Sequence, residues 1–263
     1  MDAPTDPGSG EHRTGSQSIE RALAVLGFFS DRPSLSVTEI GHLLGLSVST
    51  AHRITRALVR AGYLDQDERT ERYRLGRMMA VLGRSATESL GLDEARQSLD
   101  QLAEASGESV GLGVLDGTDV LIVISVESHQ PLRFDRASGS RTAAHASAIG
   151  KAILAYQRAE VASVVERLGE LEAYTPRTVV DPAALVTQLV HIAKGHVAVN
   201  REERYAGVCA LAAPLIDGRG VARAGVGVQV PLARFDRTRR HELAGLVMAT
   251  AAELAERLPL DRL

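Results

Sequence analysis

The segment at residues 44–60 constrains the fold most, because it combines a helix break with a helix that has two unlike faces. Gly45 ends a short preceding helix, and Ser47 or Ser49 can cap the next helix by accepting a hydrogen bond from a backbone N–H a few residues further on. At about 3.6 residues per turn, apolar side chains fall on one side of this helix and polar or basic ones on the other. The apolar set is Leu46, Ala51, Ile54 and Leu58, and the opposite set is Ser49, His52, Arg53, Arg56 and Arg60.

This helix has the side-chain types that recognition of the DNA major groove uses. Arginine forks suit guanine edges and phosphates, hydroxyls suit phosphates or base edges, and the methyl groups of Ala and Thr suit thymine. A solvated basic helix on any soluble protein has a similar composition, so the flanking segments must decide. The predicted DNA contacts on the helix are Ser47, Ser49, Thr50, His52, Arg53 and Arg56.

The flanking segments favour a winged helix-turn-helix. Apolar residues repeat at helical spacing over 19–29, and a second short helix starts at Ser36 or Thr38 and ends at Gly45, which gives the three-helix order of the helix-turn-helix class. Residues 63–64 and 73–75 then predict a short hairpin in the position of a wing. Arg72 in this hairpin is a candidate DNA contact, although the acidic residues around it fit a simply solvated hairpin tip equally well.

The composition divides the chain into four parts. Residues 1–16 predict a disordered tail, because they lack apolar periodicity. Residues 17–76 form the predicted winged helix-turn-helix domain, and 77–91 form a linker helix. That helix could also be an ordinary last helix of the first domain; we favour a connector that packs against its twin in a dimer, because helix-turn-helix proteins read paired half-sites. Residues 92–263 mix helices and strands, which predicts an α+β domain on an antiparallel sheet, with a further strand expected at 132–135.

Length and composition exclude several classes of protein. The 263 residues, 44% of them hydrophobic, are enough for two domains. No run approaches the roughly 18 apolar residues that span a bilayer, and no apolar signal region is evident, so we expect no membrane partner and a cytoplasmic protein. Cys209 is the only cysteine, which excludes an intrachain disulfide and a cysteine-rich zinc site. The net charge of −3 means that any attraction to DNA must come from a local patch.

From about Ser18 onward the chain resembles the IclR family of bacterial transcription regulators. The motifs that carry the resemblance occur in order at residues 18–23, 46–53, 62–64, 73–76, 139–141, 145–152, 207–208 and 212–214. The resemblance implies a winged helix-turn-helix, a linker helix and a C-terminal effector-binding domain with a GAF-like sheet. It also implies a homodimer or a dimer of dimers that binds a palindromic double-stranded DNA operator and responds to a small organic acid, often an aromatic one.

The predicted effector site starts where Ser147 can cap a helix that begins at Ala148. A helix N-terminus can bind an anion, although the residues alone fit a hydrated helix start more often, and it is the resemblance that favours the anion site. Members of the family that recognise very small keto acids have an Asp, a Cys and two Ser at four positions of this site. This chain has Asn200, Ala210, Gly227 and Gln229 at those positions. We therefore expect a less polar and roomier cavity for a larger acid, lined by Ser147, Ala148, Ile149, Asn200, Ala210, Gly227 and Gln229.

The assignment of these side chains depends on strand register. Cys209 stands one residue before Ala210, so we expect it to point to the other face of its strand, and a slip by one residue would reverse every facing. His145 and Lys151 have a catalytic appearance, yet residues of these types beside a helix start are more often structural.

Two rival classes remain as alternatives. One is a small-molecule enzyme of the hydrolase type, but the chain lacks a P-loop, a dinucleotide fingerprint and a nucleophile elbow, and His191 and His196 lack further ligand spacing. We therefore expect no catalytic residue, no metal and no cofactor. The other is a winged helix that contacts only proteins, which the basic outer face of the 44–60 segment disfavours.

Overall fold

The computed structural model describes the backbone of residues 11–263 and the side chains of residues 16–263. The chain divides into two compact units between Ala86 and Thr87. Each unit is built around its own buried hydrophobic residues.

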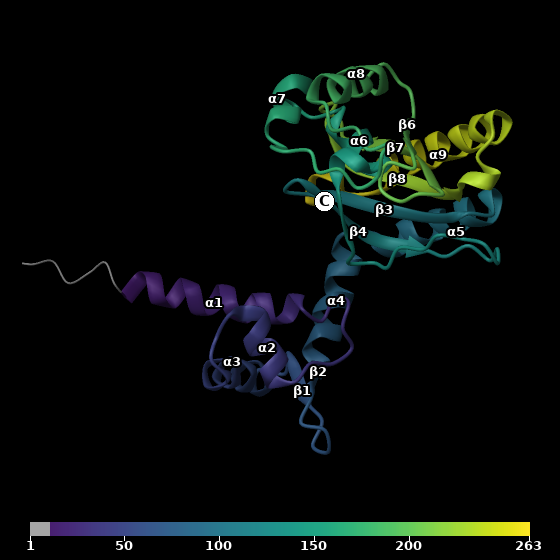
Figure 1. Ribbon diagram of the computed structural model, residues 1–263. Coiled ribbons are helices and arrows are strands. Elements are labelled where there is room, and N and C mark those ends of the chain that lie inside the picture. The colour runs from purple at the N-terminus through teal and green to yellow at the C-terminus, as the bar shows by residue number, and fades with distance from the viewer. Residues whose placement is uncertain (1–10) are drawn as a thin grey trace, which may run out of the picture. The chain divides into compact units, whose positions relative to one another are not determined.

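The N-terminal unit follows the predicted order of helices and a short hairpin (Figure 1). Its buried core joins Val25 on the first helix, Ile40 on the second, and Ala51 and Leu58 on the third. The hairpin adds Tyr73, which also forms a bridge to Leu35. The elements are α1 (Glu11–Gly27), α2 (Val37–Leu44), α3 (Val48–Arg60), β1 (Leu64–Gln66), β2 (Tyr73–Leu75) and α4 (Arg77–Ser89).

Two capping residues build the turn between α2 and α3: Gly45 ends α2, and Ser47 starts α3. Gly45 ends α2 with a φ of 64°, the left-handed conformation that glycine adopts without a steric penalty. Ser47 then caps α3 by accepting a hydrogen bond from the Thr50 amide at 3.3 Å, so Ser47 and not Ser49 is the cap.

The expected disordered tail at residues 1–16 is wrong for residues 11–16, which form the first turns of α1. In this stretch the Ser16 hydroxyl donates to Glu20 Oε1 at 2.8 Å. A helix that is already nucleated by a packed segment gains one backbone hydrogen bond for each added residue, so it can continue past the last buried side chain. Residues 1–10 of the expected tail lie outside the described residues.

The C-terminal unit is built on a six-stranded antiparallel sheet in the order β5-β4-β3-β8-β7-β6. Helices α5 (Leu92–Ser106) and α9 (Arg237–Arg257) share a core with one face of the sheet. The other face packs against α6 (Ala148–Leu154), α7 (Val161–Glu166) and α8 (Pro182–Ile192). Figure 1 shows α7 and α8 on the opposite side of the sheet from α5. The strands are β3 (Ser109–Asp116), β4 (Asp119–Val126), β5 (Arg141–Ala143), β6 (Ala198–Arg201), β7 (Val208–Ile216) and β8 (Ala222–Pro231).

The expected strand at residues 132–135 is not formed, and β5 pairs with β4 instead. Pro131 has no N–H to donate to a ladder. Side chains hold this segment: Asp135 accepts hydrogen bonds from Ser109 Oγ and Arg133 Nε, each at 2.6 Å. The β4–β5 connection is therefore a loop fixed by polar contacts.

Strand register places the predicted pocket side chains on the α6 face. Asn200 on β6 lies opposite Ala210 on β7, and Ala210 lies opposite Gln229 on β8. Cys209 is buried in the core beneath α9, on the other face, as its position beside Ala210 predicts. Within residues 11–263, no helix is long and apolar enough to cross a membrane.

Helix α6 lies so close to the preceding backbone that Gly150 has no room for a side chain. A Cβ at Gly150 would overlap the carbonyl oxygen and Cα of Ala144 and would lie 2.7 Å from its carbonyl carbon. Because these are backbone atoms, Gly150→Ala should lower the free energy of unfolding by about 1–3 kcal/mol, measured by urea unfolding followed by circular dichroism.

Gly245→Ala in α9 is the matched control for this prediction. A Cβ at Gly245 meets nothing within 4 Å, so the change should be neutral or should stabilise the helix by up to about 1 kcal/mol. An equal loss at both glycines would contradict the steric explanation.

Candidate functional site

The structure brings the predicted DNA contacts together on the outer face of α3. Ser47, Ser49, His52, Arg53 and Arg56 are exposed, and Thr50 is half-buried. The opposite face of the helix is packed, because Ala51, Thr55 and Leu58 are buried. Packing therefore fixes which side chains of α3 point to solvent, and the basic ones are among them, together with the apolar Val48 and Ala57.

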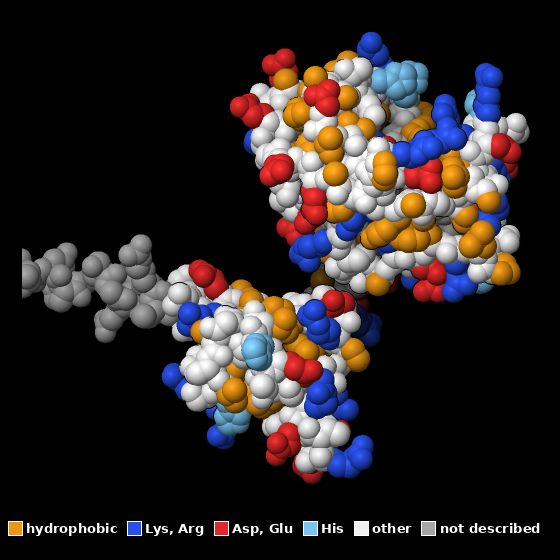
Figure 2. Space-filling view, in the orientation of Figure 1, with side chains coloured by type: hydrophobic (Ala, Val, Ile, Leu, Met, Phe, Trp, Pro, Cys, Tyr) orange, Lys and Arg blue, Asp and Glu red, His pale blue; other side chains and the backbone are white. Residues whose placement is uncertain are grey.

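A hollow between α1 and α3 extends this basic face. Arg53, Arg56 and Arg60 line it from α3, and Ser18 and Arg21 line it from α1. Arg21 was not singled out from the sequence, because nothing in the periodicity of α1 indicates which of its polar residues lies beside α3. Figure 2 shows basic and acidic side chains interspersed over the N-terminal unit on the face drawn, so the positive charge of α3 is a local feature.

Arg72 already has partners within the N-terminal unit, and its predicted DNA contact stays a prediction. Its Nε donates to Ser34 Oγ at 2.9 Å, and its Nη2 donates to the Ser34 carbonyl at 3.1 Å and lies 2.9 Å from Glu39 Oε2. The guanidinium thus ties the hairpin to the start of α2. The hydrogen bonds of Ser36 and the charge of Arg72 lower the pKa of Glu39.

In the C-terminal unit, all seven residues predicted for an effector line one pocket between α6 and strands β6, β7 and β8. The cavity itself is small, about 20 Å³, which is roughly enough for one water molecule; the wider non-atom space around it, about 400 Å³, includes open solvent. Ser147 caps α6 by accepting a hydrogen bond from the Gly150 amide at 3.3 Å. The seven are Ser147, Ala148, Ile149, Asn200, Ala210, Gly227 and Gln229.

Asn200 lines the pocket as predicted and also makes hydrogen bonds within the protein. Its side-chain N–H donates to the Ala146 carbonyl, and its Oδ1 accepts from the Glu203 amide at 3.0 Å. Both ends of the amide are thus engaged, so Asn200 positions the pocket wall and its polar atoms already have partners.

The pocket residues that the sequence reasoning missed include two arginines and a tyrosine, Arg136, Arg204 and Tyr205. They lie on the loops between β4 and β5 and between β6 and β7, where no periodicity indicates which way a side chain points. The Nε atoms of Arg136 and Arg204 are buried and lack a hydrogen-bond partner among the described residues, as does Gln229 Oε1. Burial and, beyond it, the charge of Arg204 lower the pKa of Arg136.

The comparison with relatives that recognise keto acids stays a prediction, but the pocket is more polar than the seven predicted residues alone suggest. Two guanidinium groups enter from loops outside the compared positions. At Gly227 the missing side chain leaves no void, because a Cβ there would lie 2.7 Å from the Leu211 carbonyl oxygen and 3.2 Å from Ile149 Cγ1. Ile149 of α6 and the β7 backbone thus occupy the space that a side chain at Gly227 would need.

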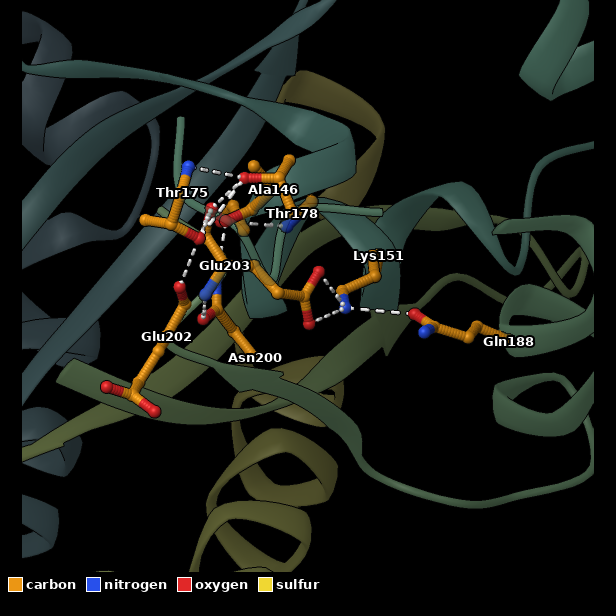
Figure 3. Close-up of polar contacts among 10 residues, drawn as sticks. Ala146, Lys151, Thr175, Thr178, Gln188, Asn200, Glu202 and Glu203 are labelled. Atoms are coloured by element: carbon orange, nitrogen blue, oxygen red, sulfur yellow. Dashed lines mark hydrogen bonds and ion pairs between the residues drawn. The ribbon is translucent and has the colours of Figure 1, made fainter. Parts of the chain in front are cut away.

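A buried ion pair holds the wall that carries Arg204. Lys151 Nζ on α6 lies 2.6 and 2.9 Å from the two carboxylate oxygens of Glu203 and donates to Gln188 Oε1 at 3.0 Å (Figure 3). The Lys151 side chain is fully buried. Burial lowers the pKa of Lys151, and the charge of Glu203 opposes that shift. Lys151 is thus structural, as predicted.

The three histidines that were considered for catalysis or metal binding make contacts within the protein. His145 Nε2 lies 3.0 Å from the Glu172 carbonyl oxygen, and the rings of His191 and His196 stack with centroids 4.0 Å apart. Parallel rings do not direct their nitrogens at a common point. In the part of the chain that the structure describes, no three His, Cys, Asp or Glu side chains gather in a metal-binding group.

Comparison with known proteins matches both units. A family model described as "IclR helix-turn-helix domain" matches residues 18–68, and one described as "Bacterial transcriptional regulator IclR C-terminal" matches residues 86–256. The HTH-type transcriptional regulator BhcR of Paracoccus denitrificans is 36% identical over 246 residues, covering 93% of this chain and 88% of that protein.

Two solved structures share the fold. A transcriptional regulator of this family from Alicyclobacillus acidocaldarius aligns with a TM-score of 0.82 at 23% identity, covering 91% of this chain and 98% of that one. An IclR homologue complexed with 4-hydroxybenzoate, from Microbacterium hydrocarbonoxydans, aligns with a TM-score of 0.78 at 24% identity, covering 91% and 99%.

The buried Lys151–Glu203 pair gives a testable asymmetry. Lys151→Met or Glu203→Leu alone leaves one buried charge without its partner, so each should lower the free energy of unfolding by about 3–5 kcal/mol. The double variant replaces both charges by apolar groups and should regain most of that loss. Urea unfolding of the three variants measures the coupling; additive losses would show that the two residues act independently.

Proposed function

The chain belongs to the IclR family of bacterial transcription regulators, and we propose that it binds a palindromic operator as a homodimer or a dimer of dimers and senses a small organic acid. It is a DNA-binding transcriptional regulator with a C-terminal effector domain, and its relatives are named as regulators and not as enzymes. The predicted α+β fold, a helix-turn-helix domain followed by an effector domain, is confirmed.

The observation that carries the DNA proposal is the solvent-facing row of hydroxyl and basic side chains on α3. Ser49, His52, Arg53 and Arg56 are exposed on a helix whose other face is buried, within a helix-turn-helix domain. We assign Arg53 and Arg56 to guanine edges or phosphates, and Ser47, Ser49, Thr50 and His52 to nearby base edges and phosphates. Arg72 is left out, because Glu39 and Ser34 engage it.

The dimer proposal rests on apolar side chains that have no cover within the described chain. Ile19 and Leu23 on α1 are 64% and 62% exposed, and Val81 on α4 is 61% exposed. Helix α4 occupies most of the predicted linker at residues 77–91, and none of its residues is buried. A second copy of this helix would cover that surface and fix the spacing of the two reading helices.

The effector proposal rests on a polar pocket in a domain whose family senses ligands. The fold neighbour from Microbacterium hydrocarbonoxydans is complexed with 4-hydroxybenzoate, an aromatic acid. In this chain two arginines and Tyr205 line the pocket. The guanidinium groups suit a carboxylate, and the tyrosine ring suits the flat or aliphatic part of the same ligand. If the acid changes operator affinity, the operator must change acid affinity by the same factor.

The DNA proposal predicts a selective loss of operator binding on removal of the α3 arginines. Arg53→Ala or Arg56→Ala should each cost about 1–3 kcal/mol, roughly a 5- to 150-fold weaker Kd, because each loses a base or phosphate contact. The measurement is fluorescence anisotropy with operator DNA selected from a random pool, over a salt series with a scrambled competitor.

Arg96→Ala is the charge-matched control for that experiment. Arg96 lies on α5 of the other unit in an exposed pair with Asp100, 3.0 Å apart. It should leave operator affinity unchanged. If the α3 variants also bind the operator normally, the helix-turn-helix serves protein contacts and the DNA proposal fails.

The dimer proposal predicts that a charge on α4 separates the subunits. Val81→Glu should shift the protein toward monomers in analytical ultracentrifugation, because a buried carboxylate without a partner opposes association. Val190→Glu on α8, where the valine is 42% exposed, is the matched control and should keep the wild-type mass. An unchanged mass for both variants would contradict a role of α4 in assembly.

A further inference from the structure

The pocket at α6 carries an uncompensated double positive charge. Its lining includes Arg136 and Arg204 and no Asp or Glu. The two arginines line the same pocket from different loops. Both side chains are half-buried, and the Nε atom of each is buried without a hydrogen-bond partner among the described residues. Buried donors normally have a partner, so two such donors on arginines that line one pocket require an explanation.

The acidic residues next to these arginines are committed elsewhere. Asp135 precedes Arg136, but its carboxylate accepts from Ser109 Oγ and Arg133 Nε. Glu203 precedes Arg204, but its carboxylate binds Lys151 Nζ. Each loop thus has an acid beside its pocket arginine, and each acid neutralises a different cation.

The arginines are also held in place by groups that do not neutralise them. The Arg204 guanidinium carbon lies 3.7 Å from the ring centroid of Tyr174 and 5.0 Å from that of Tyr205. The Tyr205 ring contacts Phe134 at a centroid distance of 4.9 Å, which joins the β6–β7 loop to the loop that carries Arg136. Aromatic faces orient a guanidinium and leave its N–H edge available to a ligand.

We propose that the effector is an organic dianion, a dicarboxylate or a carboxylate with a phosphate, whose two acidic groups bind Arg136 and Arg204 from opposite loops. This inference rests on the proposed effector role of the pocket. A single carboxylate pairs with one guanidinium group and leaves the other without a counter-charge. Two acidic groups compensate both and give acceptors to the unpartnered Nε atoms. Gln229 Oε1, also unpartnered in a residue only 8% exposed, would accept from a hydroxyl on the same ligand.

Calorimetric titration of the full chain with matched acids tests the charge of the ligand. The pairs are glutarate with butyrate, succinate with propionate, and isophthalate with benzoate, each differing by one carboxylate; phosphoglycolate tests phosphate as the second group. At least one dianion should bind ten-fold or more tightly than its monoanion partner. Equal affinities within every pair would overturn the proposal and leave a pocket for monoanions.

Arginine variants connect that preference to the two loops. Arg136→Gln and Arg204→Gln should each weaken the dianion more than the monoanion and bring their affinity ratio close to one. Arg219→Gln is the charge-matched control, because Arg219 is an exposed residue of the β7–β8 turn outside the pocket. A ratio that is unaffected by either pocket variant would contradict the assignment.

A second measurement separates this inference from the proposed function. In the ligand-free protein, Arg136→Gln should raise Tm, because it removes one of two like charges at the pocket and a buried Nε donor that has no partner among the described residues. A lowered Tm would show that Arg136 is structural and would overturn the dianion assignment even if monoanions release the operator. If Tm rises but no acid alters operator affinity, the result supports the dianion site and contradicts the effector role of the pocket.

Discussion

The C-terminal unit depends on the buried ion pair between Lys151 and Glu203. Two charges in the interior are costly to desolvate, and they are tolerated only when the geometry is good and the remaining hydrogen bonds are made. Gln188 takes another Lys151 donor, and Thr178 donates to the Glu203 carbonyl at 2.6 Å (Figure 3). Through this network α6 is fixed to the β6–β7 loop, so the helix start and the loop arginine form one rigid pocket wall.

That arrangement requires α6 to lie very close to the sheet. Gly225 and Gly227 of β8 face the helix, and a Cβ at either would lie 3.1–3.2 Å from a side-chain carbon of Ile149. Gly150 lets the helix start approach Ala144. Small residues at three points thus set the depth of the pocket. The cavity is shaped by backbone proximity, and the polar groups that enter it must come from the loops at its rim.

The sequence predicts those parts of the fold that rest on periodicity. Alternation along β7 separates Cys209 from Ala210, and helical spacing places Arg53 opposite Ala51. It fails where a single contact decides direction. Nothing local distinguishes Arg72, which is bound by Glu39 across the fold, from a free hairpin arginine. Likewise Arg136 lies in a loop whose path is set by Asp135 and not by backbone pairing.

The contrast between the cations of the C-terminal unit separates structure from function. Lys151 is fully buried and paired with Glu203, so its charge holds α6 to the β6–β7 loop. Arg234 donates to both carboxylate oxygens of Glu108, at 2.8 and 2.6 Å, and has the same kind of role. Arg136 and Arg204 are half-buried, no carboxylate lines the pocket beside them, and the Nε atom of each is buried without a hydrogen-bond partner among the described residues. Two unpaired arginines on the two loops fit a ligand that can compensate their charge. The same ligand would join the loops across the pocket.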